Sequence, residues 1–298
     1  MAESLVCGLI GTGIGRSLTP AMHEREGAAQ GLRYVYRIID LDARGLTVDD
    51  LPRLVDTAAD LGFRGLNITH PCKQRVIPLL DDLSDDAARL GAVNTVLFDG
   101  GKKIGHNTDW SGFGRSFDTG LTGASIGSVV QVGAGGAGAA VAYAIASRGA
   151  GQLTVIDADI SRASELTASM ASLFPDVEFV AGTPAEIERS LGVADGVVHA
   201  TPIGMAAHPG TAFDPALLRT SMWVAEVVYR PAQTELLTAA AALGARTLSG
   251  TGMAVHQAAD AFEIFTGLPA NADRMITHMQ ELIAFEDTVA STLAGASS

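Results

Sequence analysis

Residues 127–146, GSVVQVGAGGAGAAVAYAIA, restrict the fold of this chain more than any other stretch. These twenty residues carry no charge, and such a run is long enough to span a membrane. Glycines interrupt it, however, and Ser128, Gln131 and Tyr143 add polar groups. A β-branched run, a glycine-rich turn and an alanine-rich run indicate a strand, a turn and a helix. We therefore expect a buried βα unit here and no membrane span.

The glycines of this unit have the spacing G-x-G-x-x-G. Gly133 allows a tight turn, Gly135 lets the backbone approach a pyrophosphate, and Gly138 permits close packing of helix on strand. The helix would begin at Gly136 and Ala137, where free N–H groups attract phosphates. The motif predicts a dinucleotide site, and the alternative is a glycine-rich turn without a ligand.

Asp157 lies 19 residues after Gly138, at the end of the next predicted strand, QLTVID. An acid at this separation accepts hydrogen bonds from the adenosine ribose, and its charge repels a 2′-phosphate. This favours NAD as the cofactor and makes NADP the less favoured alternative. Arg162 is an argument for NADP, since a nearby arginine accommodates that phosphate. An ordinary acid at a strand end remains the plainer interpretation of Asp157.

Strands alternate with helices along most of the chain, which predicts an α/β fold of two domains. We expect an N-terminal α/β substrate domain, a doubly wound Rossmann domain, and C-terminal helices that return to the first domain, over residues 1–108, 109–252 and 253–298. In the first domain we expect a helix near residues 73–80 and a hairpin within residues 92–110. The second glycine-rich loop, residues 11–15, lacks the x-x-G spacing and is expected to be a turn on the substrate side.

Composition excludes several classes of protein. The net charge of −13 and the absence of basic runs argue against a nucleic-acid partner. Only Cys7 and Cys72 are present, so we expect neither a disulfide framework nor a metal site. The N-terminus lacks the pattern of a signal peptide, so we expect a cytoplasmic protein without a membrane partner.

Lys73 is unusual because only three lysines occur among the 20 cationic residues. The other two, Lys102 and Lys103, share an expected turn. Arginine stays charged in proteins, whereas a lysine can release a proton and act as an acid or a base. A solvated lysine at a helix start is the alternative.

Eight motifs in order resemble the shikimate dehydrogenase family, most closely its quinate/shikimate dehydrogenase branch. They are RSLTPAMHE (16–24), GLNITHPCKQ (65–74), GAVNTV (91–96), NTDWSGF (107–113), GAGGAG (133–138), ATPIGM (200–205), VVYRPAQTELL (227–237) and GTGMAVHQAADAFEIFTG (250–267). The resemblance extends over residues 8–268. It implies reversible NAD-dependent oxidation of shikimate to 3-dehydroshikimate and of quinate to 3-dehydroquinate.

The resemblance also implies the roles of individual residues. Lys73 matches the catalytic lysine and Asp109 its partner. The matched substrate-binding positions are Ser17, Thr19, Thr69, Asn94 and Gln257, with Tyr229 and Gly252 in motifs near the nicotinamide and Thr201 in a cofactor-binding one. A helix cap is the alternative role of Ser17 and Thr19.

Departures from the family pattern bear on specificity. The stretch DADISR from Asp157 replaces the Asn-Arg-Thr/Ser-like stretch of NADP-using members, which weakens a biosynthetic NADPH-dependent role. Thr19 in place of a second serine favours acceptance of quinate. His70 is unusual before the proline and either contacts ligand or caps the loop.

A biosynthetic shikimate dehydrogenase using NADPH, or a relative acting on an aminoshikimate, is the alternative enzyme. A non-catalytic dinucleotide-binding regulator is the alternative from another class, and the presence of both Lys73 and Asp109 argues against it. We expect a small cyclic hydroxycarboxylate as the partner molecule and leave a homodimer open.

Overall fold

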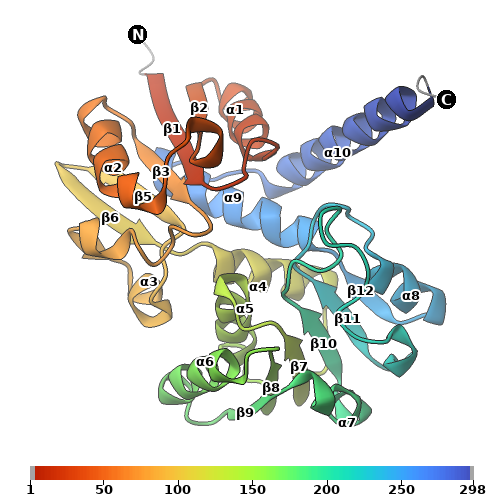
Figure 1. The fold of residues 1–298 in the computed structure, drawn as a ribbon. Helices are drawn as coiled ribbons and strands as arrows, with labels where there is room; N and C mark the ends of the chain where they lie inside the picture. Colours follow the sequence, from red (N-terminus) through yellow and green to blue (C-terminus); the bar gives the residue numbers. More distant parts are fainter. Residues whose placement is uncertain (1–3, 296–298) are drawn as a thin grey trace. The chain divides into compact units, whose positions relative to one another are not determined.

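The computed structural model describes residues 4–295, with side chains as far as residue 285. The chain divides into two compact units. The first contains residues 1–108 and 258–298, and the second contains residues 109–257. Each unit has its own six-stranded sheet (Figure 1).

In the first unit the strand order is β2-β1-β3-β5-β6-β4. Strands β1, β2 and β3 are parallel, and the hairpin β5–β6 joins antiparallel to β3. The strands are β1 (Ser4–Gly11), β2 (Arg33–Asp40), β3 (Gly65–Ile68), β4 (Asp82–Leu83), β5 (Thr95–Asp99) and β6 (Lys102–His106). The helices are α1 (Thr19–Ala29), α2 (Leu51–Asp60), α3 (Asp85–Leu90) and α10 (Ala272–Gly295), with 3-10 turns at Asp42–Arg44, Val48–Asp50 and Ile77–Leu79.

Both faces of this sheet are covered, so the middle of β1 is buried on both sides. On one face α2 contributes Leu51 and Val55 to the core, and on the other Phe262 and Phe265 of α9 (Gly250–Thr266) pack against β1 and β2. Hydrophobic strands covered by helices on both faces are what the apolar runs of the sequence predict.

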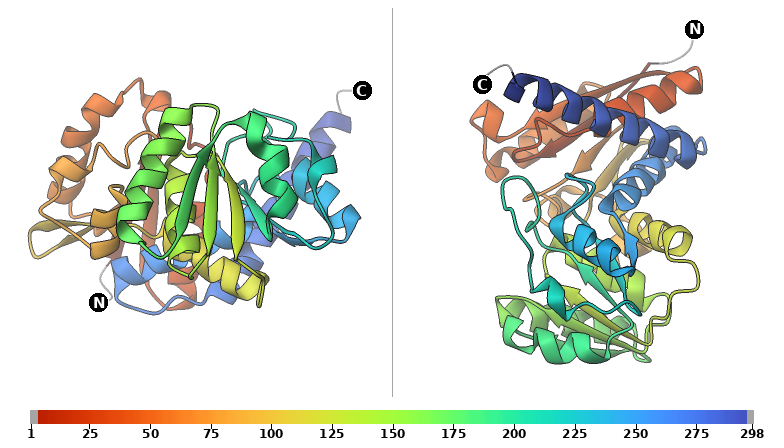
Figure 2. Two further views of the ribbon diagram at one scale, coloured as in Figure 1. Left: turned by 90° about the horizontal axis from the view of Figure 1, so that it is seen from below. Right: turned by 90° about the vertical axis from the view of Figure 1, so that its right-hand side faces the viewer.

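In the second unit all six strands are parallel and follow the order β12-β11-β10-β7-β8-β9. Helices lie on both faces of this sheet (Figure 2). The strands are β7 (Ser128–Val132), β8 (Gln152–Ile156), β9 (Glu178–Gly182), β10 (Gly196–His199), β11 (Trp223–Glu226) and β12 (Arg246–Leu248). The helices are α4 (Asp109–Gly120), α5 (Gly136–Ala146), α6 (Ile160–Leu173), α7 (Ile187–Val193) and α8 (Glu235–Leu243), with 3-10 turns at Pro184–Glu186 and Pro215–Leu217. This is the doubly wound topology, which confirms the expected fold class.

One expected element is wrong. Residues 73–76 form turns and Ile77–Leu79 a 3-10 turn, where a helix was expected near residues 73–80. Pro78 lies inside that stretch, and a proline removes a backbone donor and disfavours helical geometry in the residue before it.

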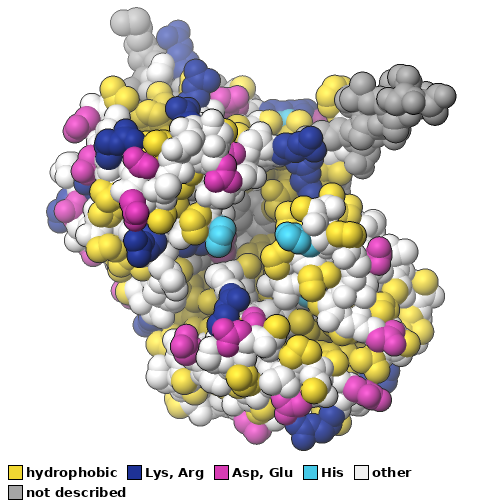
Figure 3. Space-filling view, in the orientation of Figure 1, with side chains coloured by type: hydrophobic (Ala, Val, Ile, Leu, Met, Phe, Trp, Pro, Cys, Tyr) yellow, Lys and Arg dark blue, Asp and Glu magenta, His cyan; other side chains and the backbone are white. Residues whose placement is uncertain are grey.

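Charged side chains on the face drawn in Figure 3 are scattered among apolar and neutral ones. Among the described residues, no helix is long and apolar enough to cross a membrane. Within the same part of the chain, no cluster of three or more His, Cys, Asp or Glu side chains is arranged to hold a metal ion.

Candidate functional site

The loops after β1 and β3 meet at one edge of the first sheet. The N–H of Thr12 donates to the carbonyl of His70 over 3.0 Å, and the N–H of Thr69 donates to the carbonyl of Ile10 over 2.9 Å. A Cβ on Gly11 would collide with the methyl group of Thr69, so only glycine allows this approach. The carboxyl ends of parallel strands are where α/β proteins place their ligands.

Asp40, the last residue of β2, holds the loop that follows β1. Its carboxylate accepts hydrogen bonds from the N–H groups of Gly13 (3.1 Å) and Ile14 (2.9 Å), and the side chain is 8% exposed. Farther along this loop, the hydroxyl of Ser17 accepts the N–H of Thr19 over 3.3 Å. Asp40 thus sets the course of the segment that presents Ser17 and Thr19 at the start of α1.

We expect Asp40→Asn to raise the KM for the cyclic hydroxycarboxylate that the sequence predicts as the substrate about tenfold, while changing kcat less than about threefold. An amide keeps one acceptor oxygen but turns its NH2 group toward backbone donors, so the loop loses one of its anchors. Steady-state kinetics with varied substrate measures both constants. The control is Asp42→Asn, an exposed carboxylate two residues away. An unchanged KM in Asp40→Asn would contradict the role of Asp40.

Thr69, Lys73 and Asn94 gather at the same edge. The N–H of Ile68 donates to the carbonyl of Asn94 over 2.8 Å, and the carbonyl of Lys73 accepts the N–H of Val93 over 2.9 Å. The backbone of the half-buried Lys73 is therefore bonded to Val93, the residue that precedes Asn94. Cys72 beside it is fully buried, and burial raises the pKa of its thiol, so Cys72 packs in the core and is a poor nucleophile.

Asn94 is fixed by its neighbours. Its side-chain oxygen accepts the N–H of Thr108 over 2.8 Å and the hydroxyl of Thr95 over 3.0 Å, and its NH2 group donates to the hydroxyl of Thr108 over 3.0 Å. Thr108 is the last residue of the N-terminal segment of the first unit, and Asp109 follows it directly as the first residue of α4. Chain connectivity alone therefore keeps Asp109 near the edge that carries Asn94.

In the second unit the glycine turn has the geometry that its spacing predicts. Gly133 has φ +109°, and a Cβ there would lie 2.6 Å from the carbonyl oxygen of Ala200. A Cβ on Gly138 would collide with the carbonyl oxygen of Gly133, so the helix packs closely on the turn. By contrast, a Cβ on Gly136 would meet nothing within 4 Å. The turn is thus tightly packed at Gly133 and Gly138 and has open space at Gly136. This arrangement suits a pyrophosphate at the N–H groups of Gly136, Ala137 and Gly138.

Asp157 and Arg162 both lie at this turn. The carboxylate of Asp157 accepts the N–H of Ala134 over 2.7 Å and the N–H of Asp159 over 3.0 Å. A guanidinium nitrogen of Arg162 lies 3.3 Å from the position of a Cβ on Gly135. Arg162 therefore points toward the glycine turn, where its guanidinium could contact a bound phosphate.

Thr201 follows β10 at the point where the strand order reverses between β7 and β10. A Cβ on Gly133 would lie 2.8 Å from its methyl group. This topological switch point is where doubly wound sheets bind dinucleotides.

Three further predicted site residues lie in the second unit: Gly252 and Gln257 in α9, and Tyr229 after β11. A Cβ on Gly112 of α4 would lie 2.6 Å from the backbone nitrogen of Gln257, whose side-chain amide donates to the carbonyl of Ala254 over 3.1 Å. Gly252 lies against Ser116 so closely that a Cβ would collide with its hydroxyl, which gives this glycine a packing role. Tyr229 follows β11 in the connection to α8.

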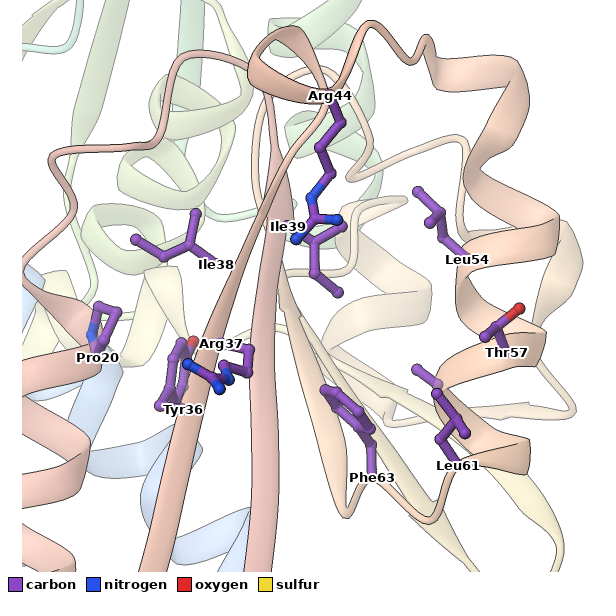
Figure 4. Close-up of a pocket in the computed structure, with 11 residues that line it drawn as sticks. Pro20, Tyr36, Arg37, Ile38, Ile39, Arg44, Leu54, Thr57, Leu61 and Phe63 are labelled. Atoms are coloured by element: carbon purple, nitrogen blue, oxygen red, sulfur yellow. The ribbon is translucent and has the colours of Figure 1, made fainter.

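A pocket of about 700 Å³ lies in the first unit beside the edge strand β2 (Figure 4). Its walls include Ile39, Leu54 and Phe63, with Arg37 and Arg44. None of the predicted site residues lines this pocket, so the candidate site is elsewhere, at the sheet edges described above.

Sequence reasoning missed three residues that organise these edges, namely Asp40, His199 and Glu226. A signal for Asp40 was present, because it is the last residue of the strand that comes after a glycine loop, and Asp157 directly follows the strand that comes after the other glycine loop. His199 and Glu226 end two adjacent strands, and nothing in their spacing indicates that they meet.

A parallel sheet in this order, with the glycine turn at its switch point and an acid after the next strand, is the architecture of a dinucleotide-binding domain, and a separate α/β unit accompanies it in this chain. Residues 9–96 match the family model "Shikimate dehydrogenase substrate binding domain", and residues 250–280 match "Shikimate 5'-dehydrogenase C-terminal domain".

Similar proteins cover almost the whole chain. Shikimate dehydrogenase (NADP(+)) of Arthrobacter sp. (strain FB24) is 53% identical over 97% of this chain and 99% of its own. Quinate/shikimate dehydrogenase (NAD(+)) of Corynebacterium glutamicum (strain R) is 55% identical over 92% and 98%. The solved quinate dehydrogenase from Corynebacterium glutamicum, in complex with NAD, is 53% identical with a TM-score of 0.89, covering 93% of this chain and 99% of its own. The chain belongs to the shikimate dehydrogenase family, and it is an oxidoreductase acting on a CH–OH group with a pyridine nucleotide.

Proposed function

We propose that this protein is an NAD-dependent quinate/shikimate dehydrogenase, which reversibly oxidises shikimate to 3-dehydroshikimate and quinate to 3-dehydroquinate. The observation that carries the choice of NAD is Asp157, whose carboxylate is bonded into the glycine turn beside the expected adenosine ribose. A second negative charge at that position, on a 2′-phosphate, would be repelled. The similarity to NAD(+) enzymes of Corynebacterium glutamicum supports the same choice.

Oxidation of a secondary alcohol removes a hydride from carbon and a proton from the hydroxyl group. The pyridine nucleotide accepts the hydride when it is bound. In our proposal the neutral amine of Lys73 accepts the hydroxyl proton and becomes an ammonium, and the carboxylate of Asp109 orients the lysine and stabilises the charge that forms. Hydroxyl and amide groups hold the ring and its carboxylate; they are contributed by Ser17, Thr19, Thr69, Asn94 and Gln257.

A biosynthetic shikimate dehydrogenase that uses NADPH is the second candidate. Arg162 favours it, because its guanidinium lies at the glycine turn and is able to neutralise a 2′-phosphate. The curated relative from Arthrobacter carries the NADP(+) name.

Steady-state assays with NAD or NADP, each with shikimate or quinate, separate the two candidates. We expect NAD to give a kcat/KM at least about tenfold above NADP with both substrates, a difference near 1.4 kcal/mol. The absorbance of the reduced cofactor follows each reaction. Activity confined to NADP and shikimate would establish the second candidate, and silence in all four assays would reject both.

A further inference from the structure

A buried acid–imidazole pair, Glu226 and His199, lies at the carboxyl ends of β10 and β11 in the second sheet. Strands β10 and β11 are parallel, with His199 and Glu226 directly opposite as their last residues. Both residues are 1% exposed. The Nδ1 atom of His199 lies 2.8 Å from a carboxylate oxygen of Glu226, and its Nε2 atom lies 2.5 Å from the hydroxyl of Thr201.

The direction of these hydrogen bonds follows from the chemistry of the groups. The Glu226 carboxylate also accepts the N–H of Val228 (3.3 Å) and the hydroxyl of Thr234 (3.2 Å). An ionised carboxylate has only acceptors, so the imidazole carries its hydrogen on Nδ1 and donates it to Glu226. In the neutral ring Nε2 is then an acceptor and takes the hydroxyl hydrogen of Thr201.

The hydrogen bonds from Glu226 through His199 lead to Thr201, in the loop of residues 201–205. This loop packs against neighbours on two sides. Toward β7, a Cβ on Gly133 would lie 2.8 Å from the methyl group of Thr201. Toward α8, a Cβ on Gly204 would lie 3.4 Å from the methyl group of Thr234. The hydroxyl of Thr201 also accepts the N–H of Ile203 over 3.2 Å. Thr201 therefore connects the buried pair to the backbone of the loop.

We propose that Glu226 and His199 are a positioning pair, which fixes Thr201 and the loop 201–205 in the conformation that receives the nicotinamide half of the cofactor. This rests on the proposed function in one respect, that the ligand is a nicotinamide dinucleotide. The two halves of a doubly wound sheet each bind one mononucleotide, and β10 opens the half opposite the adenosine-binding strands.

The pair also determines what Thr201 offers to a ligand. Its hydrogen is committed to His199 and one lone pair to Ile203, so the hydroxyl is left with a lone pair. Thr201 can thus accept a hydrogen bond from an amide NH2 group of the ligand but cannot donate one.

The test compares the whole dinucleotide with a fragment that lacks nicotinamide. Dissociation constants for NAD and ADP-ribose are measured by calorimetry on the full chain. If the wild type prefers NADP, then NADP and 2′-phospho-ADP-ribose are used instead. We expect His199→Leu and Thr201→Val to weaken the dinucleotide about tenfold or more and the fragment less than about twofold. Glu226→Gln keeps an acceptor for Nδ1–H and loses the charge, so it should give an intermediate effect. Thr167→Val is the matched control, since its buried hydroxyl donates to the carbonyls of Ala163 and Ser164 within α6.

Nitrogen NMR of the wild type supplies a second readout that does not depend on the variants folding. The His199 ring should carry its hydrogen on Nδ1, with Nε2 as an acceptor. Hydrogen on Nε2, either alone or together with hydrogen on Nδ1, would overturn the proposal, as would equal weakening of both ligands or no weakening in His199→Leu. A wild type that binds neither form of the dinucleotide would instead reject the proposed function, and this inference with it.

Discussion

Lys73→Arg is expected to lower kcat by about 10²- to 10⁴-fold, the usual contribution of a positioned acid or base. The arginine keeps the positive charge and its hydrogen-bond donors, so substrate affinity should change by less than about fivefold. Its guanidinium, however, does not release a proton in proteins. The split between kcat and affinity separates proton transfer from simple attraction of the substrate. Both are measured by steady-state kinetics and equilibrium binding of the hydroxycarboxylate.

Lys102→Arg is the matched control, because it is the same substitution at an exposed lysine of β6. It should leave both constants unaltered. If Lys73→Arg retained most of the wild-type turnover at neutral pH, proton transfer by Lys73 would be wrong. Asp109→Asn in the same assay should lower kcat as well, because the amide no longer favours the charged lysine.

Asp157→Ser is expected to reverse the cofactor preference. Hydrogen bonds to a charged group contribute about 1.5–3 kcal/mol, so loss of the carboxylate should lower kcat/KM for NAD by roughly 10- to 100-fold. The kcat/KM for NADP should rise, since the repelling charge is gone and Arg162 lies at the same turn. Kinetics with both cofactors at saturating substrate measures the ratio.

Asp159→Asn controls for the loss of a neighbouring carboxylate, because asparagine preserves the cap that Asp159 gives to α6. Its cofactor preference should equal that of the wild type. A fall with NAD unaccompanied by any gain with NADP would mean that Asp157 serves only to hold Ala134 and the turn.

The glycine motif shows how far local pattern predicts structure. Its three spaced glycines act within one strand–turn–helix unit, and each has a steric reason that is local to that unit. The structure bears out the local reasons in the positive φ of Gly133 and in the contact of Gly138 with the carbonyl of Gly133. The carbonyl that a Cβ on Gly133 would meet belongs to Ala200, however, and this close approach comes from a distant part of the chain. The helix expected near residues 73–80 shows the opposite, because Pro78 lies in that stretch and the structure forms only turns and a 3-10 turn there.

The direction of Arg162 was beyond local pattern. It lies five residues after Asp157, in the first turn of α6, and the course of that helix across the sheet decides whether the guanidinium reaches Gly135. Asp40 is a similar example. Its position at a strand end was visible, but its two bonds to Gly13 and Ile14 join residues 26 and 27 positions apart.

Strand and helix periodicity, glycine spacing and ordered motifs are properties of neighbouring residues, so the α/β class, the doubly wound half and the family could be predicted from the sequence. Three further features became visible in the folded structure: Asp40 holds one glycine loop, Asp157 holds the other, and Glu226 is connected to Thr201 through His199. These contacts depend on strand order and register. Parallel strands that pair in space are separated along the chain by whole crossovers, so no local pattern records which side chains stand opposite each other.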